Sequence, residues 1–200
     1  MGLAFYTSTK KTLTFSFSKK FHLKKTFQWA LFGIATGIKL FALFSVMPQY
    51  LINHLGHLPY WYGVMIFINS LSIILFQIPV MNFIRKFNLK NQIRVTVFLM
   101  IIGMFVIAAP GFFHLQFMMG ALLWTILLSI IEASASYLDT ISSQNGYLLT
   151  KEITSSIGGG ITILFSRYLS VNYSSTIIAF VGILCLIIAY ALTEKTVAEI

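Results

Sequence analysis

Acidic residues are scarce in this chain. Only five of its 200 residues are Asp or Glu, against 14 Lys and Arg, and Asp139 is the single aspartate. Metal-dependent phosphotransfer normally needs several acids, so that chemistry is not expected. Histidine is also rare, and none follows His114, whereas a rhomboid-like protease needs a late histidine to activate its serine. We therefore predict that the chain is not an enzyme.

Cysteine is almost absent. The single cysteine, Cys185, excludes an intrachain disulfide and a cysteine metal site. His54 and His57 lie close together in the sequence, but two ligands in one turn are a weak signal for a metal. Solvated turn residues are the preferred interpretation, so neither a metal nor another cofactor is predicted.

Charged residues of either sign make up only 10% of the chain, against roughly 25% in soluble domains. Hydrophobic residues account for 58%, and the mean hydropathy is +0.85. This composition predicts an all-α integral membrane protein. Because a helix needs about 20 residues to cross a bilayer, six transmembrane helices fill the chain and leave no room for a soluble domain.

Polar turns separate six apolar segments. The expected spans are about 27–51, 60–83, 95–109, 112–137, 153–168 and 174–192. Residues 1–26 form a basic leader before them, and residues 193–200 form a short tail. Residues 138–152 are the most polar interruption after the leader, and we expect them to form a loop.

The basic residues lie mainly on one side of these spans. Twelve of the 14 fall in the leader, in the loop that contains Arg85 and Lys90, or at Lys151 and Lys195, and Arg167 alone falls on the other side. Lys and Arg mark cytoplasmic segments and attract anionic lipid. We therefore predict a plasma (inner) membrane protein with both termini cytoplasmic. This placement also argues against nucleic acid as a partner, despite the formal charge of +9.

One carboxylate lies inside an otherwise apolar span. Glu132 shares a helical face with Thr125, Ser129 and Ser136. A charge in a spanning helix costs roughly 2.5–3.5 kcal/mol, so it normally faces a water-filled cavity or a partner. The alternative is a hydrogen-bonded glutamate that only holds helices together.

A lysine lies near the centre of the first span. Lys39 shares roughly one face with Gln28, Thr36 and Gln49, which predicts a second polar stripe facing inward. The expected spans put Lys39 and Glu132 at different depths, some 10 Å apart at 1.5 Å per residue, which leaves a direct salt bridge between them open. The secondary candidates for the lining of a cavity are Thr125, Ser129, Asn69 and Gln49.

The fifth span contains the sequence SSIGGG. Ser155 with Gly159, and Ser156 with Gly160, form two small-xxx-small pairs around Gly158. Such pairs favour close helix packing. Three consecutive glycines also permit a bend or a cavity lined by backbone, but packing is the preferred interpretation.

Two stretches carry a resemblance to a known family. They are MPQYLINHLGHLPYWYGVMIFINSLSIILFQIPVMNFIRKFNLK, residues 47–90, and LLWTILLSIIEASA, residues 122–135. The first is similar to the seventh and eighth helices, with the inner basic loop, of a major facilitator superfamily transporter, most like proton-coupled drug and metabolite exporters. The second is similar to that family's tenth helix. In the loop, Arg85 and Lys90 match the family's basic motif, whereas Ile84 and Asn88 replace its acid and glycine.

The resemblance implies the carboxyl-terminal six-helix half of a twelve-helix fold, built as two three-helix inverted repeats. It implies secondary transport of a small solute by alternating access, with Glu132 exchanging a proton or pairing with a cation, and Lys39 neutralising it or receiving an anionic substrate group. Either the chain is a truncated piece of a twelve-helix transporter, which the linker-like leader favours, or it pairs with a second half or an identical copy. A non-transporting assembly protein or an inert remnant is the alternative.

Overall fold

The protein is an all-helical bundle in a computed structural model that describes residues 23–197. The expected leader, up to residue 22, and the last three residues of the expected tail lie outside the described part. The helices are α1 (Leu23–Leu55), α2 (Trp61–Ile84), α3 (Leu89–Ala108), α4 (Met118–Gln144), α5 (Leu148–Tyr168) and α6 (Val171–Val197), with a 3-10 turn, η1 (Pro110–Phe113), before α4. No strand occurs between residues 23 and 197, so the predicted all-α fold is confirmed.

Five helices in the described part of the chain are long and apolar enough to cross a membrane, and they are α1, α2, α3, α4 and α6. They identify a multi-pass membrane protein. The remaining helix, α5, has 21 residues but carries Lys151, Glu152 and a run of Ser, Thr and Gly, which lower its hydropathy. The sequence predicted six transmembrane helices. Over residues 23–197 the structure has six long helices, and five of them are long and apolar enough to cross a membrane.

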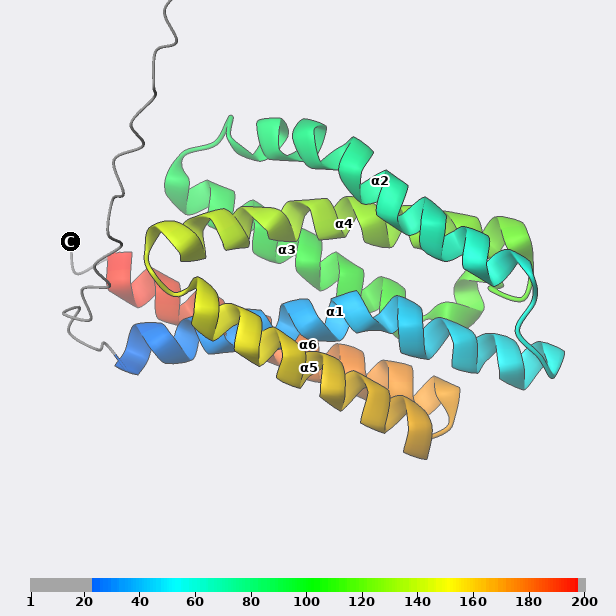
Figure 1. Cartoon of the computed structure of the whole chain (residues 1–200). Coiled ribbons are helices and arrows are strands. Elements are labelled where there is room, and N and C mark those ends of the chain that lie inside the picture. Colours follow the sequence, from blue (N-terminus) through cyan, green and yellow to red (C-terminus); the bar gives the residue numbers. More distant parts are fainter. Residues whose placement is uncertain (1–22, 198–200) are drawn as a thin grey trace, which may run out of the picture.

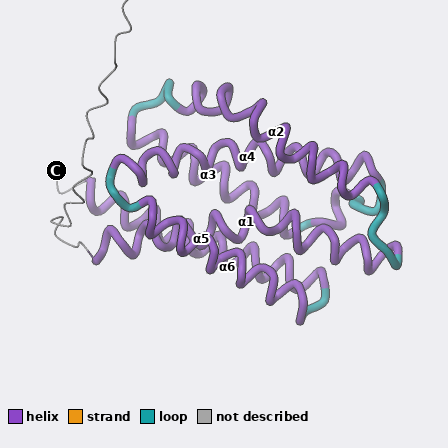
Figure 2. Tube along the Cα trace, in the orientation of Figure 1, coloured by secondary structure: helices purple, strands orange, loops and turns teal. Residues whose placement is uncertain are grey.

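The helices run alternately in opposite directions and are joined by short loops (Figures 1 and 2). The beginning of α1 and the end of α6 consequently lie at the same end of the bundle, together with the α2–α3 and α4–α5 turns (Figure 1). α1 is the most buried of the spanning helices and packs mainly against α5 and α6. α2 packs against α4, and α3 contacts both α4 and α6.

The polar segment 138–152 is not the loop that the sequence predicted. α4 continues to Gln144 and α5 begins at Leu148, so only residues 145–147 connect the two helices. An ion pair between Lys151 on α5 and Asp139 on α4 joins these extra turns. Helical turns in proteins depend more on tertiary contacts than on intrinsic propensity, and the hydropathy of a segment does not report such contacts.

The start of α4 also differs from the predicted span. Pro110 opens the 3-10 turn, and His114 follows it in the left-handed region with φ 49°. This reversal takes up residues that the sequence assigned to a helix from residue 112, and α4 begins only at Met118. The whole helix is therefore displaced along the chain by about two turns relative to the prediction.

Glycines bring α1 and α5 into direct backbone contact. A Cβ atom at Gly37 of α1 would overlap the carbonyl oxygen of Ser155, and one at Gly158 of α5 would overlap the carbonyl oxygen of Ile34. A Cβ at Gly33 would meet the backbone of α5 in the same way. Gly33 and Gly37 form a GxxxG pair that the sequence analysis did not single out, although its spacing is the signal that identifies such contacts.

The glycines of α5 differ in their surroundings. Gly158 and Gly159 are buried against α1, where a Cβ at Gly159 would meet the ring of Phe41. Nothing lies within 4 Å of a Cβ placed on Gly160, and Ser156 is exposed. The Ser155–Gly159 pair thus lies in the α1–α5 contact, whereas the Ser156–Gly160 pair lies outside it.

These two environments give a matched test of the α1–α5 contact. We expect Gly158→Ala to lower the free energy of unfolding by about 2 kcal/mol, because the added methyl must displace backbone rather than a side chain. Gly160→Ala adds the same atom to the same helix in open space, and we expect it to be neutral or stabilising by up to about 1 kcal/mol. Unfolding in detergent, followed by circular dichroism, measures both. Equal effects of the two substitutions would contradict the close contact.

Candidate functional site

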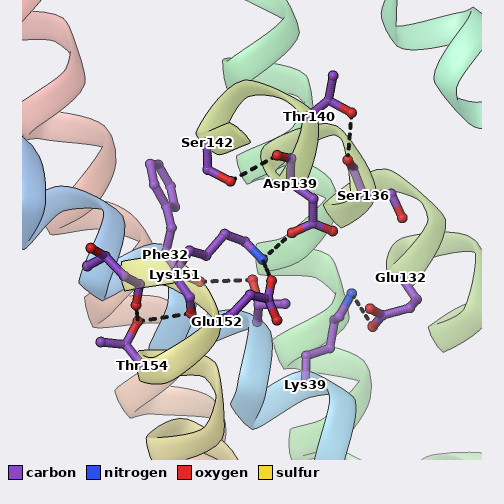
Figure 3. Close-up of polar contacts among 12 residues, drawn as sticks. Phe32, Lys39, Glu132, Ser136, Asp139, Thr140, Ser142, Lys151, Glu152 and Thr154 are labelled. Carbon is purple, nitrogen blue, oxygen red and sulfur yellow. Dashed lines mark hydrogen bonds and ion pairs between the residues drawn. The ribbon is translucent and has the colours of Figure 1, made fainter. Parts of the chain in front are cut away.

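Two charged residues from different helices meet in the middle of the bundle. Nζ of Lys39, on α1, lies 2.7 Å from Oε2 of Glu132, on α4 (Figure 3). The lysine side chain is 1% exposed and the glutamate side chain 20% exposed. The ammonium makes no aligned hydrogen bond to any other described residue. Since a buried charge is tolerated only when it is paired, Glu132 is what allows an ammonium to sit inside this bundle.

Both residues lie at the centres of their helices. Lys39 is the midpoint of Leu23–Leu55, and Glu132 is one residue from the midpoint of Met118–Gln144. The sequence analysis placed them at different depths because it began and ended the fourth helix too early. With the observed bounds, the depth difference disappears, and the salt bridge that the sequence left open is formed.

A glycine on a third helix leaves room for the lysine stem. A Cβ placed on Gly103 of α3 would lie 3.6 Å from Cδ of Lys39 and closer still to Ile131, which precedes Glu132. Any larger residue at this position would therefore crowd both sides of the ion pair. The location of the charges is thus set by α1, α3 and α4 together.

The ion pair lines a small pocket between α1, α2 and α4. Its void is about 250 Å³, including the part that is open to the outside. Leu43 and Leu128 form part of its wall one helical turn beyond the charges, and Asn69 of α2 lies opposite. The enclosed part is close to the size of a single water molecule, so the pocket as it stands holds no large solute.

The polar stripe on α4 continues from Glu132 toward α2. The hydroxyl of Ser129 lies 2.9 Å from Oδ1 of Asn69 and 2.8 Å from the carbonyl oxygen of Thr125, and its single proton is shared between these two acceptors. Thr125 is itself fully buried, and its hydroxyl has no hydrogen-bond partner within residues 23–197. Of these candidates, Asn69 contacts the pocket, Ser129 positions Asn69, and Thr125 lies one turn farther along the helix.

The other polar residues of α1 lie away from the pocket. Nε2 of Gln49 donates to the carbonyl oxygen of Leu169 at 3.1 Å, which ties the far end of α1 to the end of α5. Nε2 of Gln28 donates to Oγ1 of Thr193 on α6 at 2.6 Å. The predicted polar face of α1 is therefore divided, and only Lys39 contributes to the site.

A second buried lysine lies nearer the end of the bundle that carries the α4–α5 turn. Lys151 forms an ion pair with Asp139 on α4, and its Nζ lies 3.5 Å from Oε1 of Glu152 (Figure 3). Its side chain is 1% exposed, whereas those of Asp139 and Glu152 are 42% and 56% exposed. The sequence analysis placed these three residues in a solvated loop, and hydropathy gave no signal of the cluster. The i, i+7 spacing of Glu132 and Asp139, which puts both acids on one face of a helix, was the available signal.

The basic motif of the α2–α3 turn lies at this same end of the molecule (Figure 1). Arg85 caps the end of α2, and its side chain is exposed. Lys90 belongs to the first turn of α3, and its side chain is outside the described set. The amide of Gln92 donates to the carbonyl oxygen of Phe87 at 2.6 Å and orders this turn.

The site brings together a carboxylate that is one-fifth exposed and a buried ammonium at the edge of a small pocket. No three metal-ligating side chains gather within the described part of the chain. Comparisons with family models, with curated proteins and with solved structures gave no match to this chain.

The unequal burial of the two partners predicts an asymmetry in stability. Glu132→Leu leaves the ammonium of Lys39 unpaired in the interior, and we expect a loss of about 3 kcal/mol in the free energy of unfolding. Lys39→Met leaves a carboxylate that reaches water in the pocket, so we expect a clearly smaller loss. The double variant, which removes both charges, should recover most of the stability. Unfolding in detergent measures all three, and equal losses in the two single variants would contradict the assignment.

Proposed function

We propose that this chain is one half of a secondary active transporter of the major facilitator type, which moves a small solute across a membrane by alternating access and couples this movement to protons. The observation that carries the proposal is the ion pair between Lys39 and Glu132. It lies at the midpoint of two membrane-crossing helices and borders a pocket. Ionisable residues within spanning helices typically mark the path of a substrate or a proton.

The pair gives the site two states. In the first state, Glu132 is ionised and holds Lys39, so the pocket has no free charge. In the second state, a proton from the aqueous side binds a carboxylate oxygen of Glu132, and the ammonium of Lys39 is left without its counter-ion. An anionic group of a solute can then pair with Lys39 and restore neutrality. Release of the proton on the opposite side re-forms the Lys39–Glu132 pair and displaces the solute.

The arrangement of the helices supports the proposed inverted repeats. The most extensive contacts are α1 with α5, α2 with α4, α1 with α6, α3 with α6, and α3 with α4. Exchanging α1–α3 for α4–α6 in order maps this set of contacts onto itself. Two three-helix repeats with opposite orientation would produce such a pattern, because three is an odd number of membrane crossings.

The open side of the pocket supports the need for a second six-helix unit. Glu132 is 20% exposed toward a space between α1, α2 and α4, in the middle of helices long enough to span the membrane. Contact with acyl chains would leave that carboxylate without solvation. A second unit, either a further segment of a longer protein or an identical copy, would supply the opposite wall of an aqueous pathway.

The distribution of basic residues supports an orientation for this unit. The start of α1, the α2–α3 turn and the start of α3 lie at the end of the bundle that holds both described termini (Figure 1). These segments carry the basic residues Lys24, Lys25, Arg85, Lys86 and Arg94. This end attracts anionic lipid headgroups and is the cytoplasmic side in the proposal.

Reconstitution tests the transport activity. The chain is placed in liposomes with a pH-sensitive dye inside, and small organic acids, amino acids and amphipathic drugs are added outside one class at a time. We expect at least one class to cause proton flux and expect Glu132→Gln to abolish it, because an amide does not take up a proton. Glu152→Gln removes an exposed acid of the same type and should leave the flux intact. Flux that persists in Glu132→Gln would refute the coupling role, and no flux with any solute would refute transport by an assembly of identical copies of this chain.

Cysteine labelling tests the orientation. Cys185 is the single cysteine, so Cys185→Ala gives a background without thiols. His57 and Asn88 are exposed in turns at opposite ends of the bundle. In whole cells, we expect a membrane-impermeant maleimide to label a cysteine at position 57 and not one at position 88. Labelling in the reverse sense would overturn the proposed orientation.

A further inference from the structure

The bundle contains a boundary across which the helices make few contacts. α1 packs extensively against α5, and α2 packs extensively against α4, but α1 contacts α4 much less, and α4 contacts α5 much less. We call this boundary, between the α1–α5 pair and the α2–α4 pair, the seam. The pocket lies on it, since its walls come from α1 on one side and from α2 and α4 on the other.

Two ion pairs cross the seam, and both use an acid of α4. Glu132 pairs with Lys39 of α1 at the midpoint of the helix, and Asp139 pairs with Lys151 of α5 (Figure 3). The two acids are seven residues apart, which is about 10 Å along one face of α4. The ion pairs therefore stand one behind the other on the line that leads from the α4–α5 turn to the pocket.

The outer pair of this series is suited to opening. The carboxylate of Asp139 is 42% exposed, so water can solvate it when the pair separates. The backbone of Lys151 is held against α1, because a Cβ on Gly33 would overlap its carbonyl oxygen. Separation of the pair therefore moves α4 relative to α5 and leaves the α1–α5 contact in place. The position of Glu152 beside Lys151 gives the ammonium a remaining partner, 3.5 Å away, when Asp139 departs.

We propose that the Asp139–Lys151 ion pair is a latch that closes the seam between the pocket and the end of the bundle that carries the α4–α5 turn. Opening of the latch gives water and solute access to Lys39 and Glu132 from that side. The inference rests on the proposed function, since it assigns a gate to the same pocket. Asp139 and Lys151 act in it as positioning residues, which neither bind the solute nor exchange the coupled proton.

The latch is tested by access to the pocket. Leu43 lines the pocket on the far side of both ion pairs and is 3% exposed, so Leu43→Cys in the Cys185→Ala background reports entry along the seam. The rate of its reaction with a membrane-impermeant maleimide is measured from each side of the membrane, in spheroplasts and in inverted vesicles. A cysteine at Asn88 identifies the side that carries the α2–α3 and α4–α5 turns.

We expect Asp139→Asn to accelerate labelling of the position-43 cysteine from the side of the α4–α5 turn by about tenfold, since one charge pair is removed. Labelling from the opposite side should not change, which separates an opened gate from general loosening of the bundle. Asp139→Glu keeps the charge and should label at about the rate of the parent. Lys151→Gln removes the same pair from α5, and it replaces Asp139→Asn in the assay if that variant does not reach the membrane.

Glu152→Gln is the matched control, because it changes an acid beside Lys151 without removing the Asp139 pair. Glu152 is the partner left to Lys151 when the pair separates, so we expect its loss not to accelerate labelling of the position-43 cysteine above the parent rate. The latch would be overturned by any of three results. The rate could stay unchanged when the Asp139–Lys151 pair is removed, labelling could accelerate equally from both sides, or Glu152→Gln could accelerate it as much as Asp139→Asn. The labelling needs no solute and no proton gradient, so its result is independent of whether reconstituted protein shows proton flux.

Discussion

The structure depends on the cost of placing a lysine ammonium where water does not reach. The side chains of Lys39 and Lys151 are both 1% exposed, and α4 presents a carboxylate to each ammonium, with Glu152 as a second partner 3.5 Å from Lys151. These two requirements fix the rotation and the axial position of α4 relative to α1 and α5. Apolar side chains alone would not fix them, because Leu and Ile pack adequately in many registers and the lipid around the bundle is as apolar as its interior.

The glycines of α1 and α5 make the pairing of Lys151 with Asp139 possible. Gly33, Gly37 and Gly158 let the two backbones touch, which brings the base of Lys151 close to α1. Lys151 and Lys39 then extend toward the same face of α4 from neighbouring helices. Wider separation of α1 and α5 would take one of the two ammonium groups away from its acid. Close packing on one side of α1 and charge pairing on the other side are therefore parts of one arrangement.

The sequence predicted the helical membrane fold and the two charged residues of the site. It did not predict the bounds of α4, for a physical reason. Composition predicted the helical membrane fold, and helical spacing selected Glu132 and Lys39. Hydropathy failed at residues 138–152, because a helix end with buried, paired charges has the same composition as a solvated loop. It also failed at residues 112–117, where Pro110 and the left-handed His114 reverse the chain among apolar residues. Both errors shifted α4 along the chain, and this shift put Lys39 and Glu132 at different expected depths, which left their pairing open.

The two ion pairs differ in their surroundings, and their proposed roles differ accordingly. The mid-bundle acid is mostly enclosed, so loss of its charge strands a buried ammonium beside the pocket. The other acid is nearly half exposed, so water can solvate it when the pair separates, and the buried ammonium of Lys151 then keeps Glu152, 3.5 Å away, as its partner. The proposed pathway, which closes at one end while its centre changes charge, needs both kinds of contact. The face of α4 that carries Glu132 and Asp139 presents the two ion pairs in series, one at the middle of the helix and one toward the α4–α5 turn.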